Sequence, residues 1–319
     1  MYALAQLAMR GRLYAALVAA AFAWAAFALI QVPGAALLLL PLMPLLMYAS
    51  AAVVGLTTLR NGPTEAGLVI LGGGLAMAAG LLAAQIPVRH VLEVLFVFWV
   101  PTLVAGEVLR RRQDQGVAAS AIAISATVVA LLVLLLSGDP VVQLEAWLAK
   151  HWDEWRDMMR QSMPDAPQAR MSVTPADVAR AATHLMLSSW VFGVMMSMLL
   201  ARWWHARMDN PGGFGREFKE FRLPRWVAFA TVALMVLSFL VDGGLRTLTG
   251  ALSQVGMLLF MVQGVAVAHG VVAIRSAHVG WLVAMYLMLL VLMPESLYAI
   301  ALTGFFDHWL DYRKRAQRV

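Results

Sequence analysis

The sequence predicts an all-α protein, a polytopic transmembrane helical bundle with about eight or nine spans. Its 319 residues are 61% hydrophobic and only 13% charged, with a mean hydropathy of +0.76. A soluble domain is nearer half apolar and a quarter charged. The apolar residues also fall in runs of about 17–25, the length that a helix needs to cross a bilayer. Lipid is therefore the expected solvent.

Short segments rich in proline, glycine and asparagine separate the apolar runs, and such segments end helices. The first run follows Arg10 and Arg12 and is long for a signal peptide, so we expect an uncleaved first span. All 319 residues are expected to form one integral membrane domain. The predicted spans are residues 13–31, 35–58, 66–86, 91–109, 118–137, 182–204, 226–241 and 248–274.

Basic residues in the loops predict the orientation. A cytoplasmic N-terminus places Arg110–Arg112 and the basic loop 202–225 inside, as the positive-inside rule requires. The segment 138–181 then lies outside. The last apolar stretch, 279–306, is either one span or a hairpin. We favour a hairpin with its tip near Pro294, because it returns the basic C-terminal tail to the cytoplasm and keeps a proline out of mid-span.

The segment 139–181 is the one sizeable polar part of the chain. Its apolar residues recur at helical spacing, and Trp147, Trp152 and Trp155 lie among charged residues. This pattern is typical of an amphipathic helix that lies on the outer leaflet.

A second surface helix is expected within 210–225. Three phenylalanines share one face at i, i+4 and i+7, and basic residues lie beside them. A helix on the inner leaflet, near anionic headgroups, is the direct interpretation, and contact with a cytoplasmic partner is the alternative. The residues of this inner-surface helix are Phe214, Arg216, Phe218, Lys219, Phe221 and Arg222.

A few polar side chains inside or near the spans are candidates for ligand binding. An ionisable group within a membrane is costly and often functional, although a group near a span end can instead reach the interface. The acidic candidates would lie towards the outer side, where a pocket open to the outside could form. The candidates are Glu93, Asp242, Gln254, Gln263 and Glu295.

Small residues recur at four-residue spacing in the first span, at Ala15, Ala19 and Ala23. Such a face lets two helix backbones approach closely. It predicts either internal packing or docking to another membrane subunit.

What the sequence lacks argues against other functions, among which an intramembrane enzyme is kept as a residual hypothesis. It has no cysteine, no P-loop and no catalytic motif, so we expect no enzyme activity, no cofactor and no thiolate metal site. Asp307, His308 and Asp311 offer too few ligands for a metal, and Asp311 is expected to pair with Arg315. The net charge of +6 lies in membrane loops without base-stacking aromatics, which argues against nucleic acid as a partner.

Several blocks of the sequence resemble a known family. They are Trp99-Val-Pro-Thr-Leu with Val108-Leu-Arg-Arg, Ala201-Arg-Trp-Trp with Asn210-Pro-Gly-Gly-Phe, and Asp307-His-Trp-Leu-Asp. They resemble the YybS-like family of bacterial inner-membrane proteins, a domain of unknown function. That family looks distantly similar to the substrate-binding S components of energy-coupling-factor transporters, which dock on a membrane partner through small-residue faces. This chain has more spans and a larger outer segment than those components.

Two hypotheses of function follow. The first is a small-molecule-binding component of a transport system in the inner membrane, with the bilayer and another membrane subunit as partners. The alternative is a scaffold or assembly protein that transports nothing and binds its partners through 139–181 or 210–225.

Overall fold

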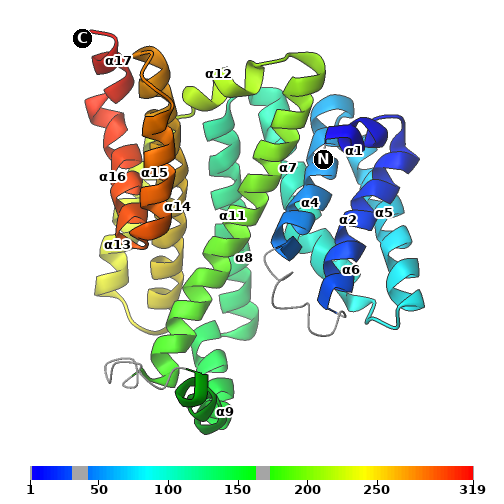
Figure 1. The fold of residues 1–319 in the computed structure, drawn as a ribbon. Coiled ribbons are helices and arrows are strands. Elements are labelled where there is room, and N and C mark those ends of the chain that lie inside the picture. The colour runs from blue at the N-terminus through cyan, green and yellow to red at the C-terminus, as the bar shows by residue number, and fades with distance from the viewer. Residues whose placement is uncertain (1, 31–41, 163–172, 319) are drawn as a thin grey trace. The chain divides into compact units, whose positions relative to one another are not determined.

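The structure, a computed structural model, describes residues 2–30, 42–162 and 173–318. The described residues are overwhelmingly helical and contain no strand. The start of the span predicted at 35–58 and part of the predicted outer segment 139–181 lie outside them. The helices in chain order (Figure 1) are α1 (Tyr2–Ala8), α2 (Arg12–Ile30), α4 (Leu42–Asn61), α5 (Pro63–Ala83), α6 (Arg89–Val94), the π-helix η1 (Leu95–Trp99), α7 (Val100–Arg112), α8 (Gln115–Ser137), α9 (Pro140–Ser162), α11 (Pro175–Asp209), α12 (Gly213–Lys219), α13 (Arg225–Leu240), α14 (Gly243–Ile274), α15 (Gly280–Val291), α16 (Glu295–Leu310) and α17 (Tyr312–Ala316).

Seven of these helical segments are long and apolar enough to cross a membrane. They are α2, α4, α5, the continuous α6–η1–α7, α8, α11 and α14. An eighth is present if α12 and α13 count as one span, bent by 51°. The all-α polytopic bundle is therefore confirmed.

The chain divides into two compact units, each built from separate stretches of sequence. Unit 1 comprises residues 1–122, 190–225 and 259–319, and unit 2 comprises residues 123–189 and 226–258. The expectation of a single membrane domain stays a prediction.

In unit 1, α2 packs against α4 and α5 through small residues. Ala15, Ala19 and Ala23 are all at most 1% exposed. The Ser50 hydroxyl donates to the carbonyl of Ala19 (2.8 Å) and accepts from the Trp99 indole N–H (2.9 Å). This buried chain of bonds connects α2, α4 and η1, and the small side chains allow the backbones to come close enough to form it.

The π-helix lies just before Pro101, which cannot donate a backbone hydrogen bond. In an α-helix the missing N–H would have gone to the carbonyl of Val97, four residues earlier. The indole N–H of Trp190 donates to that carbonyl instead. Because lipid offers no hydrogen-bond donor, a carbonyl freed by proline needs such a partner from a neighbouring helix.

The Trp190 bond can be tested by a double-mutant cycle. Trp190→Phe should lower the free energy of unfolding by about 1 kcal/mol, the scale of a hydrogen bond within a membrane protein. In a Pro101→Ala background the restored N–H can reach Val97, so Trp190→Phe should cost less than half as much. Unfolding in mixed micelles titrated with SDS measures both costs. Equal costs in the two backgrounds would contradict this assignment.

In the C-terminal part of unit 1, α14 and α16 make close backbone contact. A Cβ on Gly304 would lie 2.0 Å from the carbonyl oxygen of Phe260, so only glycine fits there. Gln263 is 0% exposed; its amide donates to the carbonyl of Gly304 and accepts from the backbone N–H of Leu223, both at 2.8 Å. One side chain thus joins α14 to α16 and to the segment before α13.

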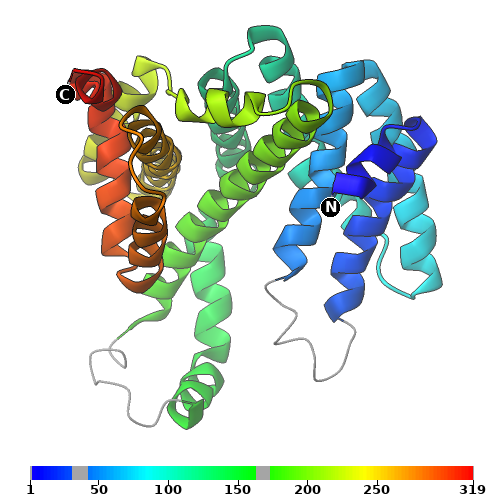
Figure 2. The same cartoon turned by 45° about the horizontal axis from the view of Figure 1, so that its top comes forward.

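The last apolar stretch is a hairpin. α15 and α16 lie side by side and are joined by the turn at 292–294, as Figures 1 and 2 both show. The two ends of the chain contact one segment of unit 1. The Arg207 guanidinium lies 4.9 Å from the Tyr2 ring centroid, and Arg313 donates to the carbonyl of Lys219 (2.9 Å). The N-terminal and C-terminal segments therefore lie at the same end of unit 1, as the hairpin interpretation requires.

The absence of cysteine makes labelling a clean test of this topology. Gln6→Cys and Gln317→Cys, both exposed positions, should react with a membrane-impermeant maleimide only from the cytoplasmic side. Ala149→Cys on α9 should react only from the outside. Opposite labelling of Gln6→Cys and Gln317→Cys would show that 279–306 crosses the membrane once.

Candidate ligand-binding pockets

Asp307 is a fully buried acid near the C-terminal end of α16. Its side chain is 0% exposed, and its carboxylate accepts from Arg222 (2.9 Å) and Arg313 (2.6 Å). It also accepts from the backbone N–H of Tyr312 (3.1 Å). Two cations and a backbone donor therefore satisfy this carboxylate and connect α16 with the turn before α13.

Asp311 completes this network. It accepts from Arg222 (3.0 Å) and pairs with Lys314 (3.0 Å). The predicted pairing of Asp311 with Arg315 is therefore wrong. Burial alone would raise the pKa of Asp311, but the hydrogen bonds and charges of Lys314 and Arg222 outweigh it and hold the pKa below its ordinary value. Burial disfavours the charged form of Arg222 as well and so tends to lower its pKa. The hydrogen bonds and charges of Asp307 and Asp311 outweigh burial and raise the pKa overall. These groups stay charged at neutral pH.

A charge-removing substitution tests the importance of the buried acid. Asp307→Asn should lower the free energy of unfolding by about 3 kcal/mol, because two guanidinium groups lose their shared counter-ion. Asp311→Asn is the matched control, since Asp311 is 25% exposed and asparagine tolerates its left-handed backbone (φ 44°). It should cost less than about 1 kcal/mol. Equal costs would contradict the assignment of Asp307 as the central ion of this network.

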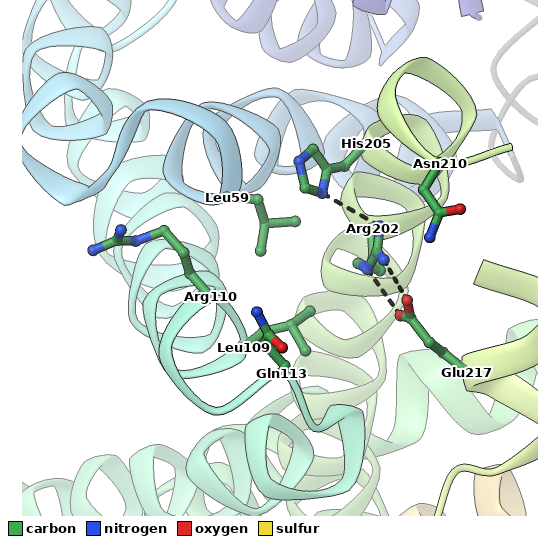
Figure 3. A pocket seen from close by; sticks show the side chains of 8 residues that line it. All are labelled: Leu59, Leu109, Arg110, Gln113, Arg202, His205, Asn210 and Glu217. Atoms are coloured by element: carbon green, nitrogen blue, oxygen red, sulfur yellow. Dashed lines mark hydrogen bonds and ion pairs between the residues drawn. The ribbon is translucent and has the colours of Figure 1, made fainter. Parts of the chain in front are cut away.

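The first pocket, which we call the Arg202 pocket, lies where four helix ends of unit 1 meet. It has a volume of about 410 Å³. Figure 3 shows its side chains, with aliphatic groups from α4 and α7 and polar groups from α7, α11 and the α12 segment. The lining residues are Leu59, Leu109, Arg110, Gln113, Arg202, His205, Asn210 and Glu217.

Arg202 is the least exposed charge that lines this pocket, at 13%. Nε and Nη2 of Arg202 both donate to the Glu217 carboxylate, Nε at 2.9 Å, and Nη1 lies 3.3 Å from Nδ1 of His205 (Figure 3). Arg110 is held by Glu107 on its own helix (2.8 Å). Each arginine of the pocket therefore has a carboxylate partner.

The second pocket, which we call the Asp242 pocket, lies in unit 2 and measures about 400 Å³. Residues from the start of α9, the first turns of α11 and the α13–α14 turn line it. Its ionisable lining residues are Asp139, Glu145, Arg180, His184, Asp242 and Arg246.

Charges in the Asp242 pocket are paired only loosely. Arg246 lies 3.9 Å from Asp242, and Asp242 is 97% exposed. Arg180 lies 3.9 Å from Asp177. Nε2 of His184 is buried and has no hydrogen-bond partner among the described residues. Asp139 differs, because it caps α9 through the N–H of Val141 (3.0 Å) and accepts from Thr247 (3.3 Å).

The five candidate ligand-binding residues do not converge on one site. Only Asp242 lines a pocket described above. Glu93 is exposed and pairs with His90 (2.7 Å). Glu295 is exposed at the N-terminus of α16, where a negative charge favours the helix dipole. Gln254 is exposed on α14 and lines neither pocket.

Two other expectations fit internal packing better than a binding role. Gln263 is buried, and backbone groups engage its amide at both ends. Ala15, Ala19 and Ala23 are buried within unit 1, so another subunit could reach them only if neighbouring helices moved away.

The inner-surface helix is shorter than expected and faces the protein. α12 spans seven residues. The Phe218 ring packs on Phe214 and on His269 of α14, with centroids 5.9 and 6.0 Å apart. Phe221 is 2% exposed, and Arg222 pairs with the buried Asp307. The phenylalanine face therefore covers other helices of unit 1. Arg216 is exposed, and the backbone carbonyl of Lys219 accepts from Arg313.

Sequence reasoning missed Arg202, His205 and Glu217 as site residues. Arg202 and His205 lie in the Arg-Trp-Trp-His stretch, and Glu217 follows fifteen residues after Arg202. An arginine and a glutamate on either side of a Pro-Gly-Gly turn can meet when the chain reverses direction. This pattern was the signal in the sequence that could have predicted the pair. Among the described residues, no group of three metal-ligating side chains could hold a metal ion.

The comparisons with known proteins give a family and no activity. No curated protein and no solved structure matches the chain. A family model described as a predicted membrane protein of the DUF2232 family matches residues 15–308. This agrees with the resemblance to an uncharacterised family of membrane proteins noted above. Because the match covers well over half of its length, the chain belongs to the DUF2232 family of membrane proteins.

Proposed function

We propose that this protein binds a small polar molecule in the Asp242 pocket and acts as the ligand-binding component of a transport system. The observation that carries the proposal is the loose pairing of charges in a cavity of about 400 Å³. Small-molecule sites have volumes of about 300–1,000 Å³ and a few polar groups that set the ligand's orientation. Charges that are poorly satisfied within the protein are available to a ligand.

The lining favours a ligand that carries charges of both signs. Arg180 and Arg246 can bind a carboxylate through paired N–H groups. Glu145 and Asp242 can bind an ammonium group, and Nε2 of His184 supplies a further hydrogen-bonding atom. A zwitterion of amino-acid size matches this set.

The predicted topology supports uptake from outside. The segments that line the pocket, 139–145 and the turn at 242–247, belong to loops that the positive-inside rule places on the outer side. The sequence has no nucleotide-binding motif, so ATP-driven transport would need another subunit.

A scaffold remains the second candidate because of α9. This 23-residue helix is strongly amphipathic, and Val142 and Trp147 are 61% and 58% exposed. An exposed face of that kind suits either the lipid interface or a protein partner.

Native mass spectrometry of the full chain, purified gently from its own membrane, tests the proposal. The expected result is a reproducible bound small molecule with a zwitterionic structure. A bare chain, or one that carries only lipid and a partner without transport function, would overturn the proposal in favour of the scaffold.

A pair of double variants locates the ligand. Asp242→Asn with Arg246→Gln should reduce the bound fraction at least about tenfold, because it removes both signs of charge from the pocket. Asp153→Asn with Arg156→Gln is the matched control; it removes an ion pair of α9 that does not line the pocket. Equal loss in both would show that the molecule binds elsewhere.

A further inference from the structure

The Arg202 pocket contains an internal carboxylate in the position of a ligand. Glu217 lies across the donor nitrogens of Arg202, the geometry in which a guanidinium binds a carboxylate or phosphate. Arg202 is 13% exposed and Glu217 is 33% exposed. The anion is therefore the more accessible member of the pair, and it lies on the short helix α12.

The rest of the lining is rich in hydrogen-bond donors. Arg110, Gln113 and Asn210 bring N–H groups from two other directions, and His205 lies beside Arg202 (Figure 3). Glu217 is the one carboxylate among the eight lining residues. Donors that approach from several helix ends match a tetrahedral oxyanion better than a planar carboxylate, which one guanidinium can satisfy.

A buried amide that contacts Glu217 from outside the pocket lining has one unsatisfied acceptor atom. Gln115 is 4% exposed and donates to Glu217 (3.2 Å). Its Oε1 atom is buried and has no hydrogen-bond partner among the described residues. A protonated phosphate oxygen could donate to such an acceptor, whereas the Glu217 carboxylate cannot.

We infer that the Arg202 pocket is a binding site for a phosphate group, and that Glu217 competes with this ligand for Arg202. When phosphate binds, Glu217 leaves the guanidinium and α12 loses this bond to α11. The phosphate comes from a small soluble molecule or from a lipid headgroup at the membrane surface, and the chemistry of recognition is the same. The inference concerns unit 1 and does not depend on the proposed function of the Asp242 pocket.

Inorganic phosphate is the first probe. The full chain is placed in phosphatidylcholine nanodiscs, and phosphate binding is followed by phosphorus NMR at constant ionic strength. Glu217→Gln removes the internal competitor and should tighten binding about tenfold. Glu220→Gln is the matched control, because it removes the same charge three residues after Glu217, at an exposed position outside the pocket. It should leave the affinity unchanged.

Hydrogen exchange of the wild-type chain gives a second readout that needs no variant. Phosphate should speed amide exchange in residues 213–219 relative to chloride at the same ionic strength. If exchange responds only when phosphatidylglycerol replaces phosphatidylcholine, the phosphate is that of a headgroup, and Glu217→Gln should then respond at a lower fraction of that lipid. No response to either phosphate source, or equal effects of Glu217→Gln and Glu220→Gln, would overturn the inference.

Discussion

Asp307 is fully buried, and a carboxylate in that position is stable only with its charge matched. Arg222 and Arg313 supply the match, and each lies on a different segment of the chain. Their bonds hold the turn before α13 against α16 and the C-terminal tail. Gln263 of α14 binds the same turn, because its side-chain oxygen accepts from the N–H of Leu223, the residue after Arg222. The course of the chain from α12 to α13 and the return of the tail therefore depend on this one buried acid.

The same rule of matched charge separates the two pockets. In the Arg202 pocket each arginine has a close carboxylate, so a ligand must displace an internal anion to bind. In the Asp242 pocket the paired charges are 3.9 Å apart and exposed, so a ligand gains interactions without breaking strong ones. The arrangement in the Arg202 pocket suits an equilibrium in which Arg202 binds either Glu217 or a ligand. The second suits a receptor site.

Hydropathy was enough to predict the helical bundle, because a bilayer allows few alternatives to helices for apolar runs of this length. The charge of the tail, together with Pro294, favoured the hairpin over a single span. Which polar residues would meet could not be predicted, since Asp307 and Arg222 are 85 positions apart and only the tertiary packing brings them together. Phe214 and Phe218 stack on one face of α12, and Phe221 follows the end of that helix, but periodicity does not say whether such a face covers lipid or protein. Asp242 was singled out because it is acidic near a span end, and its neighbours Arg180 and His184 come from a distant helix.

An experimental structure of the full chain, isolated gently from its own membrane and held in a nanodisc with a bound antibody fragment, tests the ligand-binding account most directly. The account predicts density for a small non-protein molecule between Arg246, Asp242 and His184, with the arginine turned towards it. A well-ordered Asp242 pocket that holds only water, in a chain that still carries its natural membrane partners, would contradict it.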